Sequence, residues 1–462
     1  MRLLLALLAA VYFTTSVEAG EKYNVILVYA DDMGYGDLAC FGSKLHRSPN
    51  LDRLATEGAQ LTSFYVAQAV CSASRAALLT GCYPNRIGIL GALGPNSKNG
   101  ISDKETTIAE MLQTQGYQTA CFGKWHLGHH EQFLPPNHGF QEYAGIPYSN
   151  DMWPNHPNKK ANYPDLPWIE MTKSVELNPD QTRFTKELTK RTVQFITKQK
   201  DKPFFVYLAH PMPHVPLHVA KDNPRQSKGG LYGDVIEEID WSVGQLLATV
   251  KELGLDQKTL IIFTSDNGPW LSYGNHAGTT AGFREGKGTS FEGGVRVPFL
   301  ARLPGVIPAG LKSNEPAMTI DVLPALAHVT GSQLPELTID GKSMWKLLTE
   351  PGAKSPHEAL YFYWNRELQA VRSGPWKLHL PHNYQTLKAG GGKDGKPAAY
   401  EIKKLELSLY HLGNDPAESQ NLVEKEPEEA SRLMKHVEAA RSELGDSLSQ
   451  REGRVRLPGM VK

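Results

Sequence analysis

Four short apolar runs, each followed at once by polar side chains, constrain the fold of this chain most strongly. The first, residues 24–29, reads Asn-Val-Ile-Leu-Val-Tyr. An almost unbroken apolar run of this kind is typical of a strand that is buried on both faces of a parallel sheet. The same arrangement returns at residues 118–122, 202–208 and 259–264. The sequence therefore predicts a large sheet with parallel strands at its centre.

The polar clusters after these runs carry candidate functional residues. They are, in chain order, Asp31 and Asp32, Lys124 and His126, His214, and Asp266 and Asn267. For His210 and His218, which flank His214, a structural or pocket-wall role is favoured. Parallel strands end at one edge of a sheet, and open α/β sheets bind ligands beyond that edge. We therefore expect these clusters to converge, although a solvated turn or a structural role is the alternative for any one of them alone.

Segments with helical features lie between the predicted strands. Thr107 and Glu110 resemble a capping box at the start of a helix, and residues 234–253 carry apolar side chains at helical spacing. Residues 148–180 are rich in Pro, Asn and Trp and are interpreted as a long surface loop. Residues 20–355 are therefore predicted to form a layered α/β domain, with a central mixed, mostly parallel sheet flanked by helices.

The composition changes near residues 350–358, which contain Pro-Gly and Ser-Pro pairs typical of a linker. Beyond it, alternating runs at residues 370–372 and 376–380 predict antiparallel strands. Residues 388–397 contain four glycines and predict a hairpin loop, and residues 427–444 predict a helix that begins at a proline. Residues 356–462 are thus predicted to form a smaller α+β subdomain.

The amino terminus and the charge balance indicate where the protein works. Residues 1–19 have a basic residue, a short apolar run and small residues at the end, which predicts a cleaved signal peptide rather than a membrane span of about 20 residues. Lys plus Arg and Asp plus Glu both number 49. No global charge favours nucleic acid or an anionic membrane, and no later stretch predicts stable membrane insertion. We expect export to the periplasm, the exterior or a lysosome-like compartment.

A cysteine near the start of a predicted helix is a candidate reactive group. Residues 74–79 favour a helix, and Gly81 is placed to end it in a left-handed turn. The thiol of Cys71 would then lie near the positive helix terminus and Arg75, which favours reactivity. The alternative is a packed or disulfide-bonded cysteine.

The remaining cysteines are too few for a disulfide scaffold. If Cys71 is used as a reactive group, at most one disulfide bridge can form among Cys40, Cys82 and Cys121.

The candidate residues together match one type of chemistry. Hard oxygen ligands for Ca²⁺ or Mg²⁺ come from Asp31, Asp32, Asp266 and Asn267. Cations for an oxyanion come from Arg75, Lys124 and Lys287, the last in a glycine-rich stretch. His126 and His214 can exchange protons near neutral pH. Such a set is suited to cleaving an ester of a strong oxyacid, a reaction limited by charge stabilisation.

Five blocks of the sequence resemble those of the type I, formylglycine-dependent sulfatase family. Cys71-Ser72-Ala73-Ser74-Arg75, followed by Leu79-Thr80-Gly81, matches its signature C-x-[PA]-x-R-x-x-x-L-T-G. The other blocks are residues 31–37, 123–128, 266–268 and 286–289. The sequence is most similar to the arylsulfatase A group, partly through residues 145–151. The resemblance implies an alkaline-phosphatase-like fold and a sulfuric ester hydrolase.

The resemblance also implies a role for each matched residue. A maturation enzyme would convert Cys71 to formylglycine, whose hydrate attacks sulfur and displaces the alcohol. Asp31, Asp32, Asp266 and Asn267 would hold Ca²⁺ together with residue 71. Arg75 would support residue 71, and His126 would be the base for release of sulfate. Sulfate would be bound by Lys124, His214 and Lys287, and His214 or Lys287 would protonate the leaving oxygen.

The sequence departs from the family at Ala73, where proline is more common, and this bears on how Cys71 is matured. Two alternatives stay open: a phosphodiesterase or phosphonate monoester hydrolase of the same superfamily, and a non-catalytic protein that binds sulfated glycans. The expected substrate is an aryl sulfate or a sulfated carbohydrate. Trp153 and His379 are guesses for the outer pocket.

Overall fold

The computed structural model describes residues 22–461, so the predicted signal peptide lies outside the described residues. Its main body is an 11-stranded sheet with the order β11-β2-β10-β9-β1-β8-β4-β5-β6-β7, and β12 pairs with β2. The four predicted strands lie side by side and parallel at its centre. They are β9 (Thr259–Ser265), β1 (Asn24–Ala30), β8 (Phe204–Ala209) and β4 (Gln118–Lys124). Next to β4 lies the parallel strand β5 (Glu142–Ile146).

Antiparallel strands occur towards both ends of this sheet. On one side β10 (Arg296–Arg302) runs antiparallel to β9 and to β2 (Ala59–Tyr65), which pairs in parallel with β11 (Leu311–Ser313) and β12 (Ala317–Met318). On the other side, β6 (Pro167–Glu170) and β7 (Lys173–Leu177) follow β5 in antiparallel pairing. The prediction of a mixed, mostly parallel sheet is confirmed.

The long loop predicted at residues 148–180 is only partly a loop, because β6 and β7 extend the sheet there. Trp168 and Ile169 of β6 are buried. With four and five residues, these strands are too short for an alternating pattern to stand out among the prolines.

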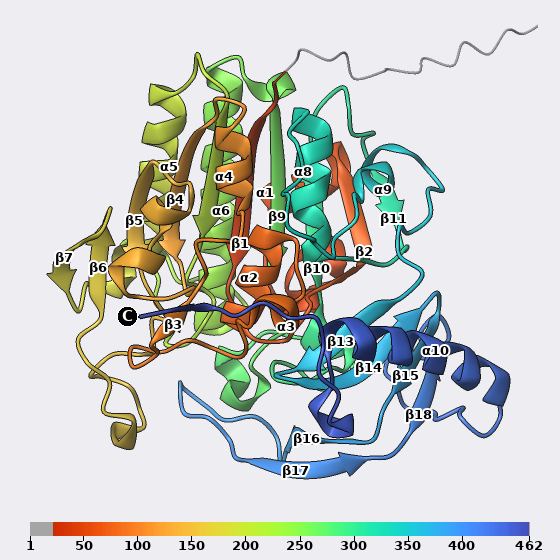
Figure 1. The fold of residues 1–462 in the computed structure, drawn as a ribbon. Coiled ribbons are helices and arrows are strands. Elements are labelled where there is room, and N and C mark those ends of the chain that lie inside the picture. The colour runs from red at the N-terminus through yellow and green to blue at the C-terminus, as the bar shows by residue number, and fades with distance from the viewer. Residues whose placement is uncertain (1–21, 462) are drawn as a thin grey trace, which may run out of the picture.

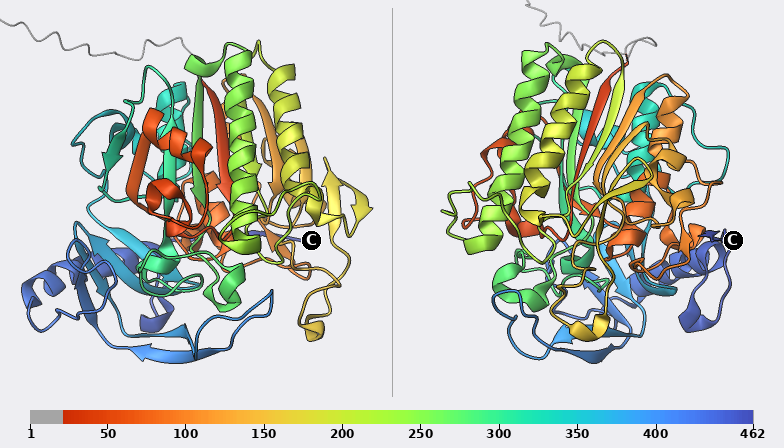
Figure 2. Two further views of the ribbon diagram at one scale, coloured as in Figure 1. Left: turned by 180° about the vertical axis from the view of Figure 1, so that it is seen from behind. Right: turned by 90° about the vertical axis from the view of Figure 1, so that its left-hand side faces the viewer.

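Helices cover both faces of the sheet, as Figure 2 shows with the sheet seen nearly edge-on. Val25, Leu27 and Tyr29 of β1 point into one apolar core, and Ile26 and Val28 point into the other. This two-sided burial explains why the run contains no polar residue after Asn24. The first core includes α2 (Cys71–Thr80), α4 (Ile108–Gln113), α8 (Val322–Thr330) and α9 (Trp345–Thr349), and the second includes α1 (Pro49–Glu57), α5 (Phe184–Lys198) and α6 (Gly230–Glu252).

The C-terminal region forms a smaller antiparallel sheet with one long helix, as predicted. Its order is β13 (Leu360–Trp364), β14 (Glu367–Ser373), β15 (Trp376–His379) and β18 (Ser408–His411). Helix α10 spans Pro427–Leu444 and packs on β14 and β15. A separate hairpin of β16 (His382–Leu387) and β17 (Tyr400–Leu405) passes beneath the lower end of the large sheet (Figure 1).

A strand pair and a buried ion cluster are among the contacts that tie the C-terminal region to the main body. The chain end returns as β19 (Gly459–Met460) and pairs with β3 (Asn99–Gly100). In addition, Lys377 Nζ lies 2.9 Å from Glu292 Oε1 and 3.1 Å from Glu418 Oε1. Glu292 begins the short helix α7 (Glu292–Val295), so this buried ion cluster joins β15 to the main body.

His379 belongs to the same cluster, which overturns its assignment to the outer pocket. Its side chain is fully buried, and Nε2 donates to Glu418 Oε1 at 2.7 Å. Burial lowers the pKa of His379 to about 4, even though the glutamate opposes the shift. His379 therefore has a packing and hydrogen-bonding role.

Within residues 22–461, no helix combines the length and apolar character that a membrane crossing needs. All four cysteines lie in this range and are free.

Candidate active site

The carboxyl ends of β1 and β9 bring four oxygen-bearing side chains together. Asp31 and Asp32 follow β1, and Asp266 and Asn267 follow β9, its neighbour in the sheet. All four residues are buried. The N–H of Asp32, whose φ is 64°, donates to Asp266 Oδ1 at 3.0 Å. Asn267 Nδ2 donates to Asp32 Oδ1 at 2.6 Å. The structure thus places these two predicted clusters in contact.

Two lysines neutralise the first carboxylate pair. Lys124, the last residue of β4, places Nζ 2.5 Å from Asp31 Oδ2 and donates to Ser149 Oγ at 3.1 Å. Lys287 Nζ lies 2.6 Å from Asp32 Oδ1. Burial alone would lower the pKa of each lysine, but Asp31 and Asp32 raise it above the ordinary value. Both lysines are therefore charged at neutral pH.

Arg75 fixes helix α2 against the ends of β4 and β9. Its buried guanidinium donates from Nε and Nη2 to Asp266 Oδ2 at 3.1 and 2.8 Å, and from Nη1 to the backbone oxygen of Lys124 at 3.0 Å. Nη2 also lies 3.5 Å from Asp31 Oδ2. Burial would raise the pKa of Asp31, but Lys124, His214 and Arg75 together hold it below its ordinary value. A carboxylate with this many cations around it remains ionised.

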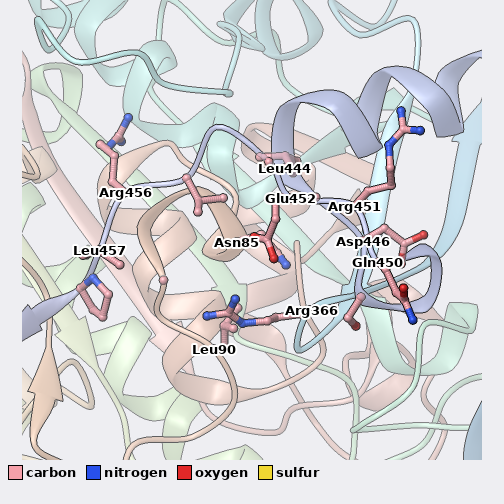
Figure 3. A pocket seen from close by; sticks show the side chains of 16 residues that line it. Asn85, Leu90, Arg366, Leu444, Asp446, Gln450, Arg451, Glu452, Arg456 and Leu457 are labelled. Carbon is pink, nitrogen blue, oxygen red and sulfur yellow. The ribbon is translucent and has the colours of Figure 1, made fainter.

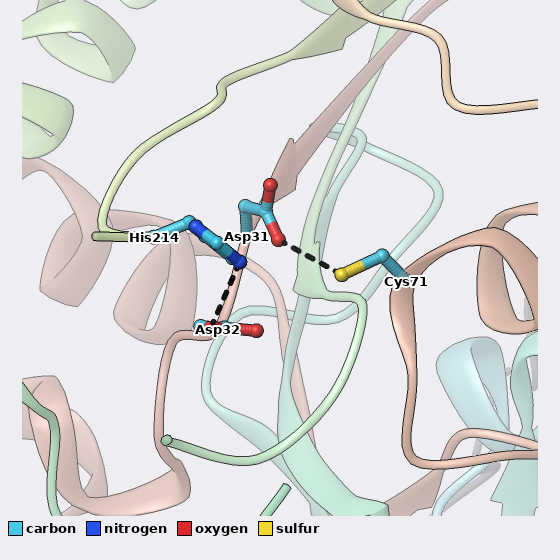
Figure 4. Close-up of side chains that lie close together, drawn as sticks. All are labelled: Asp31, Asp32, Cys71 and His214. Atoms are coloured by element: carbon cyan, nitrogen blue, oxygen red, sulfur yellow. Dashed lines mark hydrogen bonds and ion pairs between the residues drawn. The ribbon is translucent and has the colours of Figure 1, made fainter. Parts of the chain in front are cut away.

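Cys71 is the first residue of α2, three residues before the predicted helix start. Gly81, with a φ of 70°, ends that helix as expected. Cys71 Sγ lies 3.5 Å from Asp31 Oδ1 (Figure 4) and 3.6 Å from Lys287 Nζ. Burial raises the pKa of the thiol, although Lys124 and Lys287 oppose the shift. The expectation of an activated thiol is therefore wrong, because desolvation outweighs the helix terminus and the lysines.

Two histidines face the same group of atoms. His126 Nε2 donates to the backbone oxygen of Leu93 at 2.7 Å, so in the neutral ring Nδ1 carries the lone pair. Nδ1 is buried and has no hydrogen-bond partner among the described residues. Burial first and then Lys124 lower the pKa of His126 well below its ordinary value. A neutral imidazole with a free lone pair is able to accept a proton.

His214 is placed differently. Its Nδ1 donates to the backbone oxygen of Val215 at 2.6 Å, which directs Nε2 into the site. Nε2 lies 3.6 Å from Asp32 Oδ2 (Figure 4) and 3.4 Å from Ser149 Oγ. Lys124, Ser149 and His214 therefore form a row of potential hydrogen-bond donors beside Cys71.

Trp270 forms one wall of the site. Lys287 Nζ lies 4.5 Å from the centroid of its ring, and the His214 ring lies 5.5 Å from it. Tyr273 packs edge-on against the other side at 4.9 Å. Trp270 is only partly buried, so it lies between the charged interior and solvent.

Comparison with known proteins agrees with this arrangement. Residues 23–332 match the sulfatase family model, and residues 355–457 match the model for the C-terminal region of aryl-sulfatase. The chain belongs to the sulfatase family.

Among its relatives is arylsulfatase A of Bos taurus, 38% identical over 93% of this sulfatase and 90% of that protein. The N-acetylgalactosamine-6-sulfatase of Canis lupus familiaris is 34% identical, with coverage of 90% and 84%. Among solved structures, the PsFucS1 sulfatase from Pseudoalteromonas sp. superposes with a TM-score of 0.81 at 28% identity and covers 91% of each chain. These findings make the protein a sulfuric ester hydrolase.

The donor set of the sulfatase fits a divalent metal ion. One ligand atom each from Asp31, Asp32, Cys71 and His214 lies within 4.8 Å of the others. Asn267 Oδ1 is buried and has no hydrogen-bond partner among the described residues. An unpartnered buried carbonyl beside ionised carboxylates is suited to bind a hard cation.

Ala73 marks the departure of this sulfatase from the more common proline. Its N–H donates to the backbone oxygen of Gly91 at 3.2 Å. Proline lacks this N–H and could not make the bond. The backbone at Gly91 is therefore attached to α2 by a hydrogen bond that alanine can make at position 73 and proline cannot.

Sequence reasoning missed Ser149 and Trp270 as site residues. Ser149 follows β5, so it obeys the same rule as the other clusters, but β5 reads Glu-Tyr-Ala-Gly-Ile and is not an apolar run. Trp270 comes four residues after Asp266 and belongs to no periodic pattern. His210 has the structural environment favoured for it, since its Nε2 and Ser242 Oγ are 3.1 Å apart. Trp153 packs edge-on near His218, with ring centroids 6.4 Å apart.

A small cavity of about 90 Å³ elsewhere in the sulfatase is separate from this site (Figure 3). It lies between the short helix α3 (Pro84–Ile87), Arg366 and the C-terminal segment after Leu444. None of the predicted site residues lines it.

Proposed function

We propose that this sulfatase hydrolyses an aryl sulfate or a sulfated carbohydrate through formylglycine made from Cys71, with Ca²⁺ bound beside it. The observation that carries the proposal is the position of Cys71 between Asp31 and Lys287, with Sγ 3.5 and 3.6 Å from them. A formylglycine-generating enzyme would have to act on this residue. As a hydrated aldehyde, residue 71 would supply the hydroxyl that attacks the sulfur of the ester.

Asp31, Asp32, Asp266 and Asn267 would hold the calcium ion together with residue 71. Ca²⁺ accepts many protein oxygen ligands, whereas Mg²⁺ usually keeps several waters. The three carboxylates balance Arg75, Lys124 and Lys287 in the structure. A divalent ion would therefore leave the site positively charged, which would stabilise an anionic ester and its transition state.

Other side chains of the sulfatase would bind the sulfate group and position residue 71. Lys124, His214 and Lys287 would bind the sulfate oxygens, and Ser149 Oγ lies between the first two as a further polar contact. Arg75 would hold residue 71 in place through α2.

Proton transfer would involve two positions. His126 would accept a proton at Nδ1, because its Nε2–H is already bonded to Leu93. His214 Nε2 or Lys287 Nζ would protonate the leaving alcohol oxygen, since both point toward Asp32 beside Cys71.

We also propose that residues 1–19 are removed on export, that residues 20–355 form the catalytic domain and that residues 356–462 form the C-terminal subdomain. The leader composition and the change of sheet type support these limits. Sequencing the amino terminus of protein purified from its natural host should give Gly20 as the first residue.

Two measurements test the proposed chemistry. Turnover of 4-nitrophenyl sulfate should exceed that of bis(4-nitrophenyl) phosphate, and the reverse would identify a phosphodiesterase. Mass spectrometry of the peptide containing residue 71 should show a loss of about 18 Da from cysteine, as conversion to formylglycine requires. If protein from the native host contains only the thiol, a non-catalytic glycan-binding role is favoured instead.

A further inference from the structure

The β16–β17 hairpin brings the C-terminal region to the active site. Gln385 Nε2 of β16 donates to the backbone oxygen of Lys287 at 3.1 Å. Gly288, with a φ of 85°, has no room for a side chain, because a Cβ there would lie 2.3 Å from Gln385 Nε2. The hairpin is thus fitted closely against the segment that carries Lys287.

The loop beyond these strands, residues 388–399, continues along the rim of the site. The N–H groups of Gly392 and Ala398 both donate to the backbone oxygen of Ser272, at 2.8 and 2.7 Å. Asn275 Nδ2 donates to Asp394 Oδ1 at 2.9 Å. Ser272 and Asn275 belong to the same short segment as Trp270, whose ring contacts Lys287 and His214. The loop is therefore held next to the wall of the site.

A tight turn within this loop places two lysines, Lys393 and Lys396, opposite each other. The N–H of Lys393 donates to Lys396 O at 3.1 Å, and the N–H of Lys396 donates to Lys393 O at 3.0 Å. Asp394 and Gly395 between them have φ values of 53° and 79°, as in a type I′ turn. Like charges in directly opposed positions are unfavourable, so this pair is not explained by the stability of the hairpin.

The lysines of the loop form no ion pair in the described part of the chain, and Asp394, the acidic residue between two of them, is hydrogen-bonded to Asn275 instead. Lys388, Lys393 and Lys396 are exposed, and within residues 22–461 no carboxylate forms an ion pair with any of them. By contrast, Lys403 and Lys404 on β17 are paired with Glu401 at 3.3 Å and with Glu406 at 2.7 Å. One hairpin thus carries an unpaired group of lysines on the loop and a paired group on a strand.

We infer that Lys388, Lys393 and Lys396 bind a second sulfate group of a glycan whose first sulfate group occupies the active site. The inference rests on the proposed function and narrows the substrate to a glycan with more than one sulfate group. Exposed ammonium groups on a loop fixed beside the site can bind an anion without displacing a protein partner. A monosulfated aryl ester has no second sulfate group and would not use these lysines.

Direct binding tests the inference independently of turnover. The probe is a fluorescein-labelled dextran sulfate oligosaccharide, with unsulfated dextran as blank, and the readout is the Kd from fluorescence anisotropy. The double variant Lys393→Ala/Lys396→Ala should weaken binding about fivefold or more, since each exposed charge contact contributes modestly. The dependence of Kd on salt should also become shallower, because fewer counterions are exchanged.

The matched control is Lys403→Ala/Lys404→Ala, which removes the same charge from the same hairpin and should change Kd less than about twofold. Both variants should hydrolyse 4-nitrophenyl sulfate at the wild-type rate. Equal weakening in the two variants would overturn the inference, as would failure of the wild type to bind the sulfated probe. If the loop variant loses affinity for phosphatidylserine vesicles but not for the probe, the lysines contact a membrane surface and the inference is wrong. A wild type that binds the probe but does not cleave 4-nitrophenyl sulfate would count against the proposed function alone.

Discussion

Replacing Lys377 by methionine removes the cation of the buried cluster that joins β15 to the main body. Its ammonium group lies 2.9 Å from Glu292 and 3.1 Å from Glu418, and all three side chains are fully buried. Removing one partner of a buried ion pair leaves an uncompensated charge and costs about 3–5 kcal/mol. Arg296, 3.2 Å from Glu292, compensates part of this loss. We therefore expect a loss of about 3 kcal/mol in the free energy of unfolding.

The same contacts give stability a pH dependence of known sign. Burial would raise the pKa of Glu292, but Lys377, Arg296 and Arg372 lower it from 4.5 to about 2. A depressed carboxyl pKa contributes stability that is present above the unfolded pKa of 4.5 and is lost as the pH falls toward 2. Without Lys377, the pKa of Glu292 should lie closer to its unfolded value, because one of the cations that lower it is gone. The methionine variant should therefore lose less stability than the wild type between pH 5 and 2.

Equilibrium unfolding in urea, followed by tryptophan fluorescence at pH 7 and at several lower values, measures both quantities. Lys403→Met is the control, because its ammonium group is exposed and should contribute less than about 0.5 kcal/mol. The reasoning would be refuted by a loss at pH 7 below about 1 kcal/mol, or by parallel pH profiles for Lys377→Met and the wild type.

Three further predictions concern the site and its supports. Cys71→Ala should abolish hydrolysis of 4-nitrophenyl sulfate while changing the free energy of unfolding by less than about 2 kcal/mol, since the lost side chain is small; residual turnover of the variant would count against a role for residue 71. Removing metal with EGTA should abolish activity, and added Ca²⁺ but not Mg²⁺ should restore it; activity that survives exhaustive chelation would contradict the calcium proposal. Gly123→Ala would place a Cβ 1.9 Å from the backbone oxygen of Ala209, at a φ of 120°, so it should lower the thermal midpoint and the activity. The control is Gly116→Ala, because Gly116 also has a positive φ but has open space around it; this variant should cause a smaller loss.

The central sheet could be predicted from the sequence because burial on two faces leaves a clear pattern. Val25 to Tyr29 of β1 contact both cores, so selection for burial acts on every residue of the run. The start of α4 could also be predicted. Thr107 Oγ1 accepts from the N–H of Glu110 at 3.2 Å, as the capping box predicts. Burial on both faces of one strand and capping of a helix each involve neighbouring residues, so a short stretch of sequence is enough to predict them.

Effects that depend on distant packing could not be predicted. The pKa of the Cys71 thiol depends on burial and on charges from distant segments, including Lys287, which lies 216 residues further along the chain. From the sequence, His379 is a guess for the outer pocket, yet it is buried against Glu418, which comes 39 residues later. Ser149 was missed because the strand before it, β5, contains glutamate and glycine and is not an apolar run. For Cys71 and His379, the missing information was a contact between segments far apart in the chain.

The burial of Cys71 also sets an order of events during synthesis. In the finished fold only 2% of the residue is exposed, and Lys287, which touches its sulfur atom, lies 216 residues further along the chain. A modifying enzyme cannot reach a side chain enclosed in this way. If Cys71 is converted to formylglycine, the conversion must take place before the segment around Lys287 closes over it, so the time available is set by how quickly the rest of the chain is made and folds.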